Sequence, residues 1–336
     1  MKKKTQLGLQ VSEKEYRDIP FPSYSLLSDI SKNGTSVIGG ARNTEIGEMD
    51  SVIFGKIVDS LLTDKKDPDN LYVVTKSPTG KAKAIIKALA SYSHLMPNKQ
   101  DIFHEDNKEI LDGICEKLNY YKKYETRLKG LENYVDYFNT YKRIVLNKIK
   151  DENKPKPEDC VIVSKYIYSS STFCSKIIKK NKPEYFSEGY AKSNQEELIY
   201  QVKLVEEFEG IKIKGMLDGV RIIHKEKKII PFDLKTGSYS ITQFMEKGII
   251  GWNYYIQAAL YQKLLEKHIR ENNPEFDDYE ICDFVFIYAD RLTMGDVIQF
   301  NCSEEGKIEL KNDWAFVEVT SIKSLINDYK KHINNN

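Results

Sequence analysis

The feature that most constrains this chain is an alternating stretch that begins at Ile211 and is followed, after a polar break, by a second apolar run. In IKIKGMLDGVRII, Lys212 and Asp218 fall on one side of an extended chain, while Ile213 falls on the other. This period of two is typical of a β-strand with one buried face. Residues 224–227 are polar and 228–235 again form an apolar run. The two runs therefore predict an antiparallel hairpin.

The register of this hairpin decides which side chains meet. A loop centred between Lys225 and Glu226 places Asp218 directly opposite Asp233, with their Cβ atoms about 5 Å apart. Lys235 lies two residues beyond Asp233 and projects from the same face. A shift of the loop centre by one residue would remove this pairing, so the register is a prediction for the structure to test.

Two carboxylates at that distance repel each other, and such a pair is tolerated when a proton or a cation lies between them. Oxygen ligands favour a hard ion, either Mg²⁺ or Mn²⁺. A lysine beside the ion can hold a water molecule or stabilise charge that develops on a phosphate. Asp218, Asp233 and Lys235 on one face therefore indicate metal-assisted hydrolysis of a phosphodiester.

The pattern Asp-x-Lys has an alternative interpretation as solvated surface. It also occurs at residues 64–66, 106–108 and 328–330, where nothing else marks a site. The motif Asp233-x-Lys235 differs because an apolar strand leads into it and a facing strand carries a second aspartate. An ordinary surface hairpin remains the alternative.

Three motifs together resemble the PD-(D/E)xK nuclease superfamily: Gly215-x-x-Asp218, Asp233-x-Lys235 and Gln257-x-x-x-Tyr261. The resemblance is to the branch that holds RecB-type nuclease domains, exonuclease VIII and phage recombination exonucleases. It covers roughly residues 197 to 265. The proline of the family name is displaced, because Pro231 lies two residues before Asp233.

The resemblance implies an α/β fold, with a central mixed sheet flanked by helices and a helical insertion. It implies Mg²⁺ as the cofactor, with Mn²⁺ able to substitute, bound by Asp218, Asp233 and the carbonyl of Leu234. Lys235 would position or activate the attacking water. Gln257 would hold the substrate strand or the lysine. Tyr261, on the same helix face as Gln257, would support the site or a phosphate, with interior packing as the alternative.

A further aspartate, Asp59, lies in a predicted helix over residues 51–63. Aspartate has a low propensity for the interior of a helix, so we expect it to have a partner. Gly55-x-x-x-Asp59 resembles a Gly-x-x-x-His pattern in the same superfamily, with aspartate in place of histidine. The resemblance implies that Asp59 is a third metal ligand; a solvated or lysine-paired aspartate is the alternative.

Along the whole chain we expect a single nuclease domain over residues 1–336. Residues 1–20 would form a flexible N-terminal arm or an edge segment, residues 81–182 a helical insertion, and residues 191–305 the catalytic core sheet and motif helix. We expect one continuous helix from about Thr242 to Asn272, and insertion helices at 81–93, 105–122, 129–150 and 157–178.

Composition limits the classes of partner. The chain has 51 basic and 50 acidic residues, so it has no global basic field and any affinity for DNA must come from a local patch or from bound metal. The five cysteines form no C-x-x-C pair, which argues against an iron–sulfur cluster and favours a reducing cytosol. No apolar run approaches the length of a membrane span. We expect a cytoplasmic protein of a bacterial or phage-infected cell.

The sequence therefore predicts a metal-dependent DNA exonuclease that acts on linear double-stranded DNA, in recombination or end resection. By resemblance, it would form a homo-oligomer and work with a single-strand annealing protein. Two alternatives stay open. One is a single-strand exonuclease or a structure-selective endonuclease on the same site, and the other is a catalytically inactive DNA-binding or assembly module.

Overall fold

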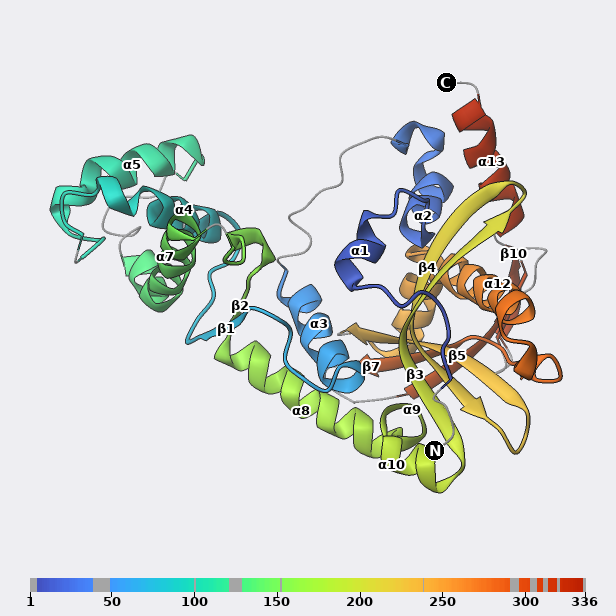
Figure 1. Ribbon diagram of the computed structural model, residues 1–336. Helices are drawn as coiled ribbons and strands as arrows, with labels where there is room; N and C mark the ends of the chain where they lie inside the picture. The colour runs from blue at the N-terminus through green and yellow to red at the C-terminus, as the bar shows by residue number, and fades with distance from the viewer. Residues whose placement is uncertain are drawn as a thin grey trace. The chain divides into compact units, whose positions relative to one another are not determined.

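The computed structural model describes residues 5–38, 49–99, 101–120, 129–151, 153–237, 239–290, 296–302, 307–310, 314–318 and 321–334. The chain divides into two compact units, coloured along the sequence in Figure 1. The first unit comprises residues 1–43, 62–64 and 174–336, and the second comprises residues 44–61 and 65–173. The second unit covers most of the expected insertion and begins before it.

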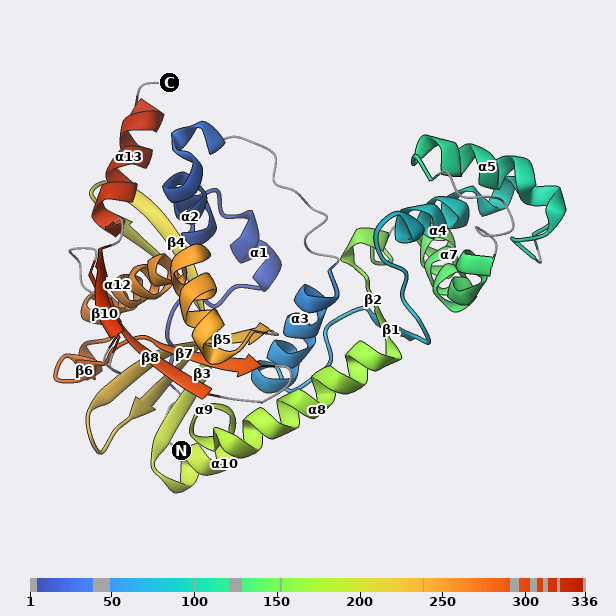
Figure 2. The same cartoon turned by 180° about the vertical axis from the view of Figure 1, so that it is seen from behind.

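A mixed sheet forms the framework of the first unit, as the sequence predicts for an α/β fold (Figure 2). Its order is β10-β9-β8-β7-β5-β4-β3, with β6 paired to β5. The pairs β5–β7 and β5–β6 are parallel, and the other neighbours are antiparallel. The strands are β3 (Glu196–Phe208), β4 (Ile211–Ile223), β5 (Lys228–Gly237), β6 (Glu280–Ile281), β7 (Val285–Asp290), β8 (Asp296–Cys302), β9 (Lys307–Leu310) and β10 (Trp314–Glu318).

The β4–β5 hairpin has the register that the sequence predicts. Gly219 pairs with Phe232 and Ile223 with Lys228, so the turn is centred between Lys225 and Glu226. The preceding turn joins β3 to β4 through Glu209 and Gly210, whose φ angles are 52° and 77°. Two positive φ angles belong to the type I′ turn, whose twist matches that of the strands it connects.

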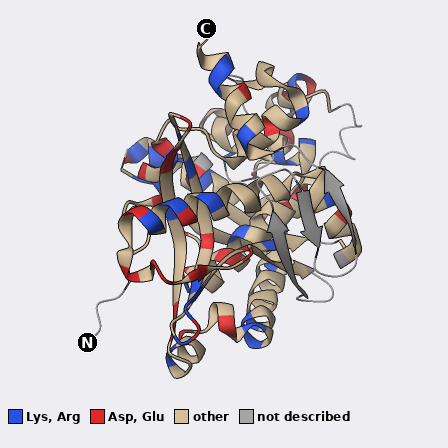
Figure 3. Ribbon diagram, turned by 90° about the vertical axis from the view of Figure 1, so that its right-hand side faces the viewer, with Lys and Arg blue, Asp and Glu red and all other residues tan. Residues whose placement is uncertain are grey.

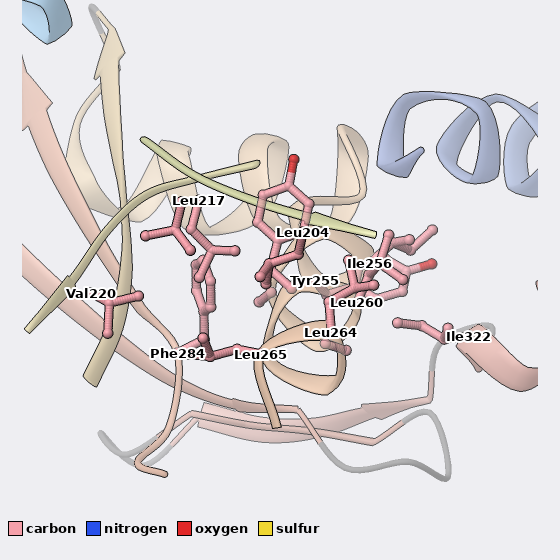
Figure 4. Close-up of a cluster of buried hydrophobic side chains, with 14 of the residues drawn as sticks. Leu204, Leu217, Val220, Tyr255, Ile256, Leu260, Leu264, Leu265, Phe284 and Ile322 are labelled. Atoms are coloured by element: carbon pink, nitrogen blue, oxygen red, sulfur yellow. The ribbon is translucent and has the colours of Figure 1, made fainter. Parts of the chain in front are cut away.

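The motif helix packs its apolar side chains against β3, β4 and the residues around Phe284, as Figure 4 shows. Ile256, Leu260 and Leu264 are fully buried there. At Gly215, an added Cβ would lie 2.5 Å from a methyl group of Leu264, so a glycine at this position allows the helix to approach the strand. Truncating any of these three apolar side chains to alanine would cost about 2–5 kcal/mol of folding free energy.

The helical region before this packing surface differs from the prediction. In place of one helix from Thr242 to Asn272, the structure has α11 (Ile241–Gln243), a π-helical segment (Phe244–Gly251) and α12 (Tyr254–Asn272). Asn253 lies between the π-helical segment and α12 and adopts the left-handed conformation, with φ of 59°. Asparagine tolerates this conformation better than most residues, and nothing in the hydrophobic pattern marks the break.

The N-terminal residues pack against the sheet, which agrees with the edge-segment alternative for residues 5–20. The segment contains α1 (Glu13–Asp18), and Leu7 and Tyr16 are buried. The Leu9 amide donates to the carbonyl of Lys203 on β3, at 2.7 Å. The ammonium of Lys214 on β4 donates to three carbonyls at the end of α1, those of Tyr16, Arg17 and Ile19. A basic group at this position stabilises the helix C-terminus.

The remaining helices of the first unit cover the sheet and its edges. They are α2 (Tyr24–Asn33), α9 (Pro183–Phe186), α10 (Glu188–Ser193) and α13 (Ile322–Asn334). Figure 3 shows basic and acidic residues interspersed along the ribbon rather than gathered by sign. This matches the near-zero net charge of the chain. Within the described ranges, no helix has both the length and the apolar character to cross a membrane.

The second unit has its own apolar core. Buried side chains such as Ile85, Leu89 and Phe138 pack together around a two-stranded parallel sheet, β1 (Leu71–Val74) and β2 (Val161–Ser164). The expected helix over 157–178 begins instead with β2, and β1 has no counterpart among the expected elements, so both strands were missed. The helices are α3 (Asp50–Thr63), α4 (Gly80–Tyr92), α5 (Lys108–Lys117), α7 (Val135–Lys150) and α8 (Lys165–Asn181), of which α3 and α8 each end in the first unit.

Candidate active site

Three elements of the first unit bring polar side chains to one place. Asp218 lies on β4, Asp233 and Lys235 lie on β5, and Gln257 lies on α12. Asp218 directly precedes Gly219, which pairs with Phe232. Oδ2 of Asp218 accepts a hydrogen bond of 2.8 Å from the backbone N–H of Leu234. The carboxylate thus reaches across to β5, where its negative charge acts on the Lys235 ammonium.

Asp233 is the centre of this arrangement. Its side chain is 3% exposed. One carboxylate oxygen accepts a hydrogen bond from the ammonium of Lys235, and the other accepts one of 2.7 Å from Nε2 of Gln257. A buried carboxylate needs such partners, because burying an unpaired charge is costly. The sequence predicted Asp233 and Lys235 on one face. The resemblance implied that Gln257 would hold the substrate strand or the lysine, whereas its amide donates to Asp233.

Gln257 has one oxygen without a partner. Its Nε2 must face Asp233, because only the N–H₂ end of the amide can donate to a carboxylate. Oε1 then points elsewhere, is buried, and has no hydrogen-bond partner among the described residues. An unsatisfied buried acceptor costs about 1–3 kcal/mol. This oxygen is therefore available to accept a hydrogen bond from a ligand or a solvent molecule.

Electrostatics keep the lysine charged. Burial disfavours the ammonium form of Lys235, but the negative charges of Asp233 and Asp218 outweigh burial, and the pKa of Lys235 is raised. Burial raises the pKa of Asp233, against the opposing effects of Lys235 and Gln257. The two carboxylates thus favour the ammonium form of Lys235, and that form can orient a water molecule or stabilise an anion.

Three tyrosines surround this cluster. The ring of Tyr254 lies under the Lys235 ammonium, 4.8 Å from centroid to nitrogen, an attractive cation–π geometry. Tyr261 is 8% exposed, and burial followed by the charge of Asp233 raises the pKa of its hydroxyl. Tyr24 packs edge-on against Tyr261 at 6.5 Å between centroids. Tyr261 thus packs beside the carboxylates, as the packing alternative predicted; a direct contact with substrate remains a prediction.

The donors fit a hard divalent ion. The charges of two carboxylates, Asp218 and Asp233, both act on Lys235, and Mg²⁺ commonly takes one or two carboxylates and keeps several waters. Within the part of the chain that is described, no three His, Cys, Asp or Glu side chains form a ready metal cluster. Asp59 lies on α3 in the second unit. Its role as a third ligand therefore stays a prediction, as does the role of the Leu234 carbonyl.

Sequence reasoning missed Tyr24 as part of the site. It is the first residue of α2, and no local pattern links it to a residue more than 200 positions away. Tyr254 could be found, because it lies three residues before Gln257 and extends the same helix face. The hydroxyl of Tyr24 also donates to the carbonyl of Trp252, at 2.9 Å.

Comparisons with known proteins add little to this geometry. No family model matches the sequence, and no curated protein matches it. Among solved structures, a putative exonuclease from Eubacterium rectale is 13% identical with a TM-score of 0.33, over 97% of this chain and 85% of that one. The protein SSO0001 is 10% identical with a TM-score of 0.25, over 88% and 87%. Neither likeness is strong enough to support a conclusion about fold or activity.

Proposed function

We propose that this chain is a metal-dependent deoxyribonuclease. The observation that carries the proposal is the convergence of Asp218, Asp233, Lys235 and Gln257 from β4, β5 and α12, with the unpartnered oxygen of Gln257 beside them. A purely structural ion pair has no need for a second carboxylate and an unsatisfied amide at the same point.

Each residue has a role that its contacts support. Asp218 and Asp233 would hold Mg²⁺ or Mn²⁺, with the Leu234 carbonyl and Asp59 as further candidate ligands. When bound, the ion lowers the pKa of a coordinated water and screens charge on the leaving oxygen. Lys235 would position or activate the attacking water and stabilise charge on the phosphate. Gln257 fixes the orientation of Asp233 through its amide N–H.

The finer assignment is an exonuclease on linear double-stranded DNA. It rests on the resemblance of the three motifs to the exonuclease VIII and phage recombination exonuclease branch. The same resemblance supports a cytoplasmic homo-oligomer that cooperates with a single-strand annealing protein in recombination or end resection. A single-strand exonuclease or structure-selective endonuclease would use the same residues, so substrate form is the first quantity to measure.

The test is hydrolysis of linear duplex DNA, labelled at the 5′ or the 3′ end, in the presence of Mg²⁺. We expect release of short products from one labelled end, none with EDTA and none with Asp233→Asn. Glu196→Gln is the matched control, because it changes a buried acid of the same sheet outside the cluster. Closed circular duplex of the same sequence should stay intact.

Each contrary outcome has a distinct meaning. Cleavage of circular duplex would replace the exonuclease with an endonuclease. Full activity of Asp233→Asn would exclude the cluster as the catalytic site. If the unmodified protein bound DNA but cleaved no form of it with either Mg²⁺ or Mn²⁺, the inactive binding-module alternative would stand.

A further inference from the structure

Beside the cluster lies a group of aromatic side chains that the hydrolytic roles do not use. We call Tyr239, Trp252 and Tyr254 the aromatic shelf. The ring centroids of Trp252 lie 5.5 Å from Tyr239 and 5.8 Å from Tyr254. Tyr254 in turn lies under the Lys235 ammonium. The shelf therefore runs outward from the proposed catalytic lysine to the surface.

Trp252 is too exposed to be explained as core packing. It is 40% exposed, although tryptophan is usually well buried on average. The plane of its indole ring makes an angle of 53° with the ring plane of Tyr239 and 67° with that of Tyr254. Neither tyrosine therefore stacks parallel on the indole, and another flat ring could lie against it.

Hydrogen bonds to the backbone of Trp252 and of Tyr239 fix the position of the shelf. The N–H of Trp252 donates to the carbonyl of Lys247 at 2.8 Å, and its carbonyl accepts from the Tyr24 hydroxyl. The hydroxyl of Tyr288 contacts Tyr239 twice, accepting from its N–H at 3.0 Å and donating to its carbonyl at 2.9 Å. A fixed surface loses little conformational entropy when a ligand binds, which favours binding.

Positive charge lies at both ends of the shelf. The Lys247 ammonium lies 4.9 Å from the ring centroid of Tyr239, and the Lys235 ammonium lies 4.8 Å from that of Tyr254. Lys247 is exposed. Aromatic rings that alternate with cationic groups are the elements by which proteins bind single-stranded nucleic acid, with rings stacking on bases and lysines contacting phosphates.

We propose that the aromatic shelf binds an unpaired nucleotide of the substrate strand, with a base stacked on Trp252 and a backbone phosphate at Lys247. This inference rests on the proposed nuclease function and deepens it by naming the substrate form. The strand that reaches Asp233 would be single-stranded there, either from the outset or because the end of the duplex has opened. Stacking involves no hydrogen-bond readout, so binding should be tolerant of base sequence.

The chain offers a direct spectroscopic test, because its only tryptophans are Trp252 and Trp314. Trp314→Phe leaves Trp252 as the single indole emitter. We expect an eight-residue oligothymidylate, added in EDTA so that no cleavage occurs, to quench this emission in a saturable way. An abasic oligonucleotide with the same number of phosphates should bind more weakly and leave the emission unchanged.

Variants separate stacking from charge. Trp252→Ala should weaken oligothymidylate binding about tenfold or more, as expected when one base–aromatic stack is lost, and Trp252→Phe should retain most of it. Lys247→Ala should weaken both oligonucleotides equally and reduce the salt dependence of binding. Ile250→Ala is the matched control, because Ile250 is 42% exposed on the same π-helical segment. This variant should change the affinity for neither oligonucleotide.

If Trp314→Phe impairs folding, the Trp252 emission can be obtained instead as the difference in emission between the unmodified chain and Trp252→Phe. Binding without quenching, equal quenching by the abasic oligonucleotide, or no binding at all would overturn the proposal. Quenching of the Trp252 emission by phosphatidylcholine vesicles but not by the oligonucleotide would also overturn the proposal, because it would indicate contact with lipid. Hydrolysis without stacking refutes only the shelf, whereas stacking by a chain that cleaves no DNA refutes only the nuclease.

Discussion

Two buried ion pairs lie on the same sheet and differ in one respect. Arg221 on β4 makes two parallel hydrogen bonds to Glu196 on β3, at 2.7 and 2.9 Å, and its guanidinium lies over the Tyr185 ring. Lys235 pairs with Asp233 in a similarly buried setting, with side-chain exposures of 17% and 3%, against 13% and 7% for Arg221 and Glu196. Burial alone therefore does not distinguish a structural pair from the pair proposed to act in catalysis.

What distinguishes the pairs is how completely they are satisfied. The Glu196–Arg221 pair is bidentate, which is the strongest geometry for guanidinium and carboxylate. The Asp233–Lys235 pair uses a compact ammonium, has a second carboxylate from Asp218 nearby, and borders an unpartnered Gln257 oxygen. A complete pair stabilises the fold, whereas an incomplete one has capacity left to bind a ligand.

The largest expected difference is in catalysis. Asp233→Asn should lower the rate of DNA hydrolysis about a thousandfold or more, because loss of one carboxylate weakens the binding of the ion that supplies several kcal/mol of transition-state stabilisation. Glu196→Gln should leave the rate within about twofold. Single-turnover rates on labelled duplex measure both. Equal losses would show that the two pairs do not differ in function.

The converse difference is in stability. Glu196→Ala leaves the Arg221 guanidinium buried without its carboxylate and should cost about 3–5 kcal/mol of unfolding free energy. Urea denaturation followed by circular dichroism gives this value. The hydrolysis rate per folded molecule should be unchanged. A cost under about 1 kcal/mol would mean that water solvates the Arg221 guanidinium once its carboxylate partner is removed.

Gln257 allows a sharper test. Gln257→Leu removes both the hydrogen bond to Asp233 and the unpartnered oxygen. We expect the affinity for Mg²⁺ to fall about tenfold to a hundredfold, as is typical when a group that orients a metal ligand is lost. Mg²⁺ titration of the hydrolysis rate measures this change, and calorimetry of Mn²⁺ binding measures it without DNA. An unchanged affinity would restrict Gln257 to packing.

The smallest expected effect is a gain in stability. Asp233→Asn combined with Lys235→Met removes both charges of the incomplete pair, and we expect unfolding free energy to rise by about 1–2 kcal/mol while activity is lost. The corresponding Glu196→Gln and Arg221→Met combination should be close to neutral, because a well-formed bidentate pair is removed. Thermal denaturation compares the two double variants, and the opposite order would invalidate the distinction.

The sequence predicted the hairpin and its register because those depend on local alternation and on the turn position. It predicted Asp233 and Lys235 on one face for a similar reason, since the strand period fixes which side chains share a face. The place of Gln257 beside them was implied only by the resemblance of its motif. The sequence could not predict the break at Asn253, because a left-handed asparagine leaves no hydrophobic signature. The strands β1 and β2, four residues each, are too short to produce a recognisable period.

Tyr24 and the path of the N-terminal segment were beyond prediction for a different reason. Their contacts join residues that are distant in sequence, and these depend on the assembled sheet. Gly8 illustrates this: its φ is 72°, and a Cβ there would lie 2.4 Å from the carbonyl oxygen of Lys203. Only the folded partner explains why a glycine is needed.

That segment also limits how copies of the chain can associate. It hydrogen-bonds the outer side of β3 at Leu9, and at Pro22 it accepts from the Lys214 amide on the other side of the β3–β4 hairpin. Both borders of the hairpin near its tip thus already have a backbone neighbour from their own molecule. Strand exchange or cross-molecule sheet extension at this point would first require displacing residues 8–23. Copies of the chain that meet at this hairpin should therefore associate through side-chain surfaces, and truncating those residues should promote aggregation.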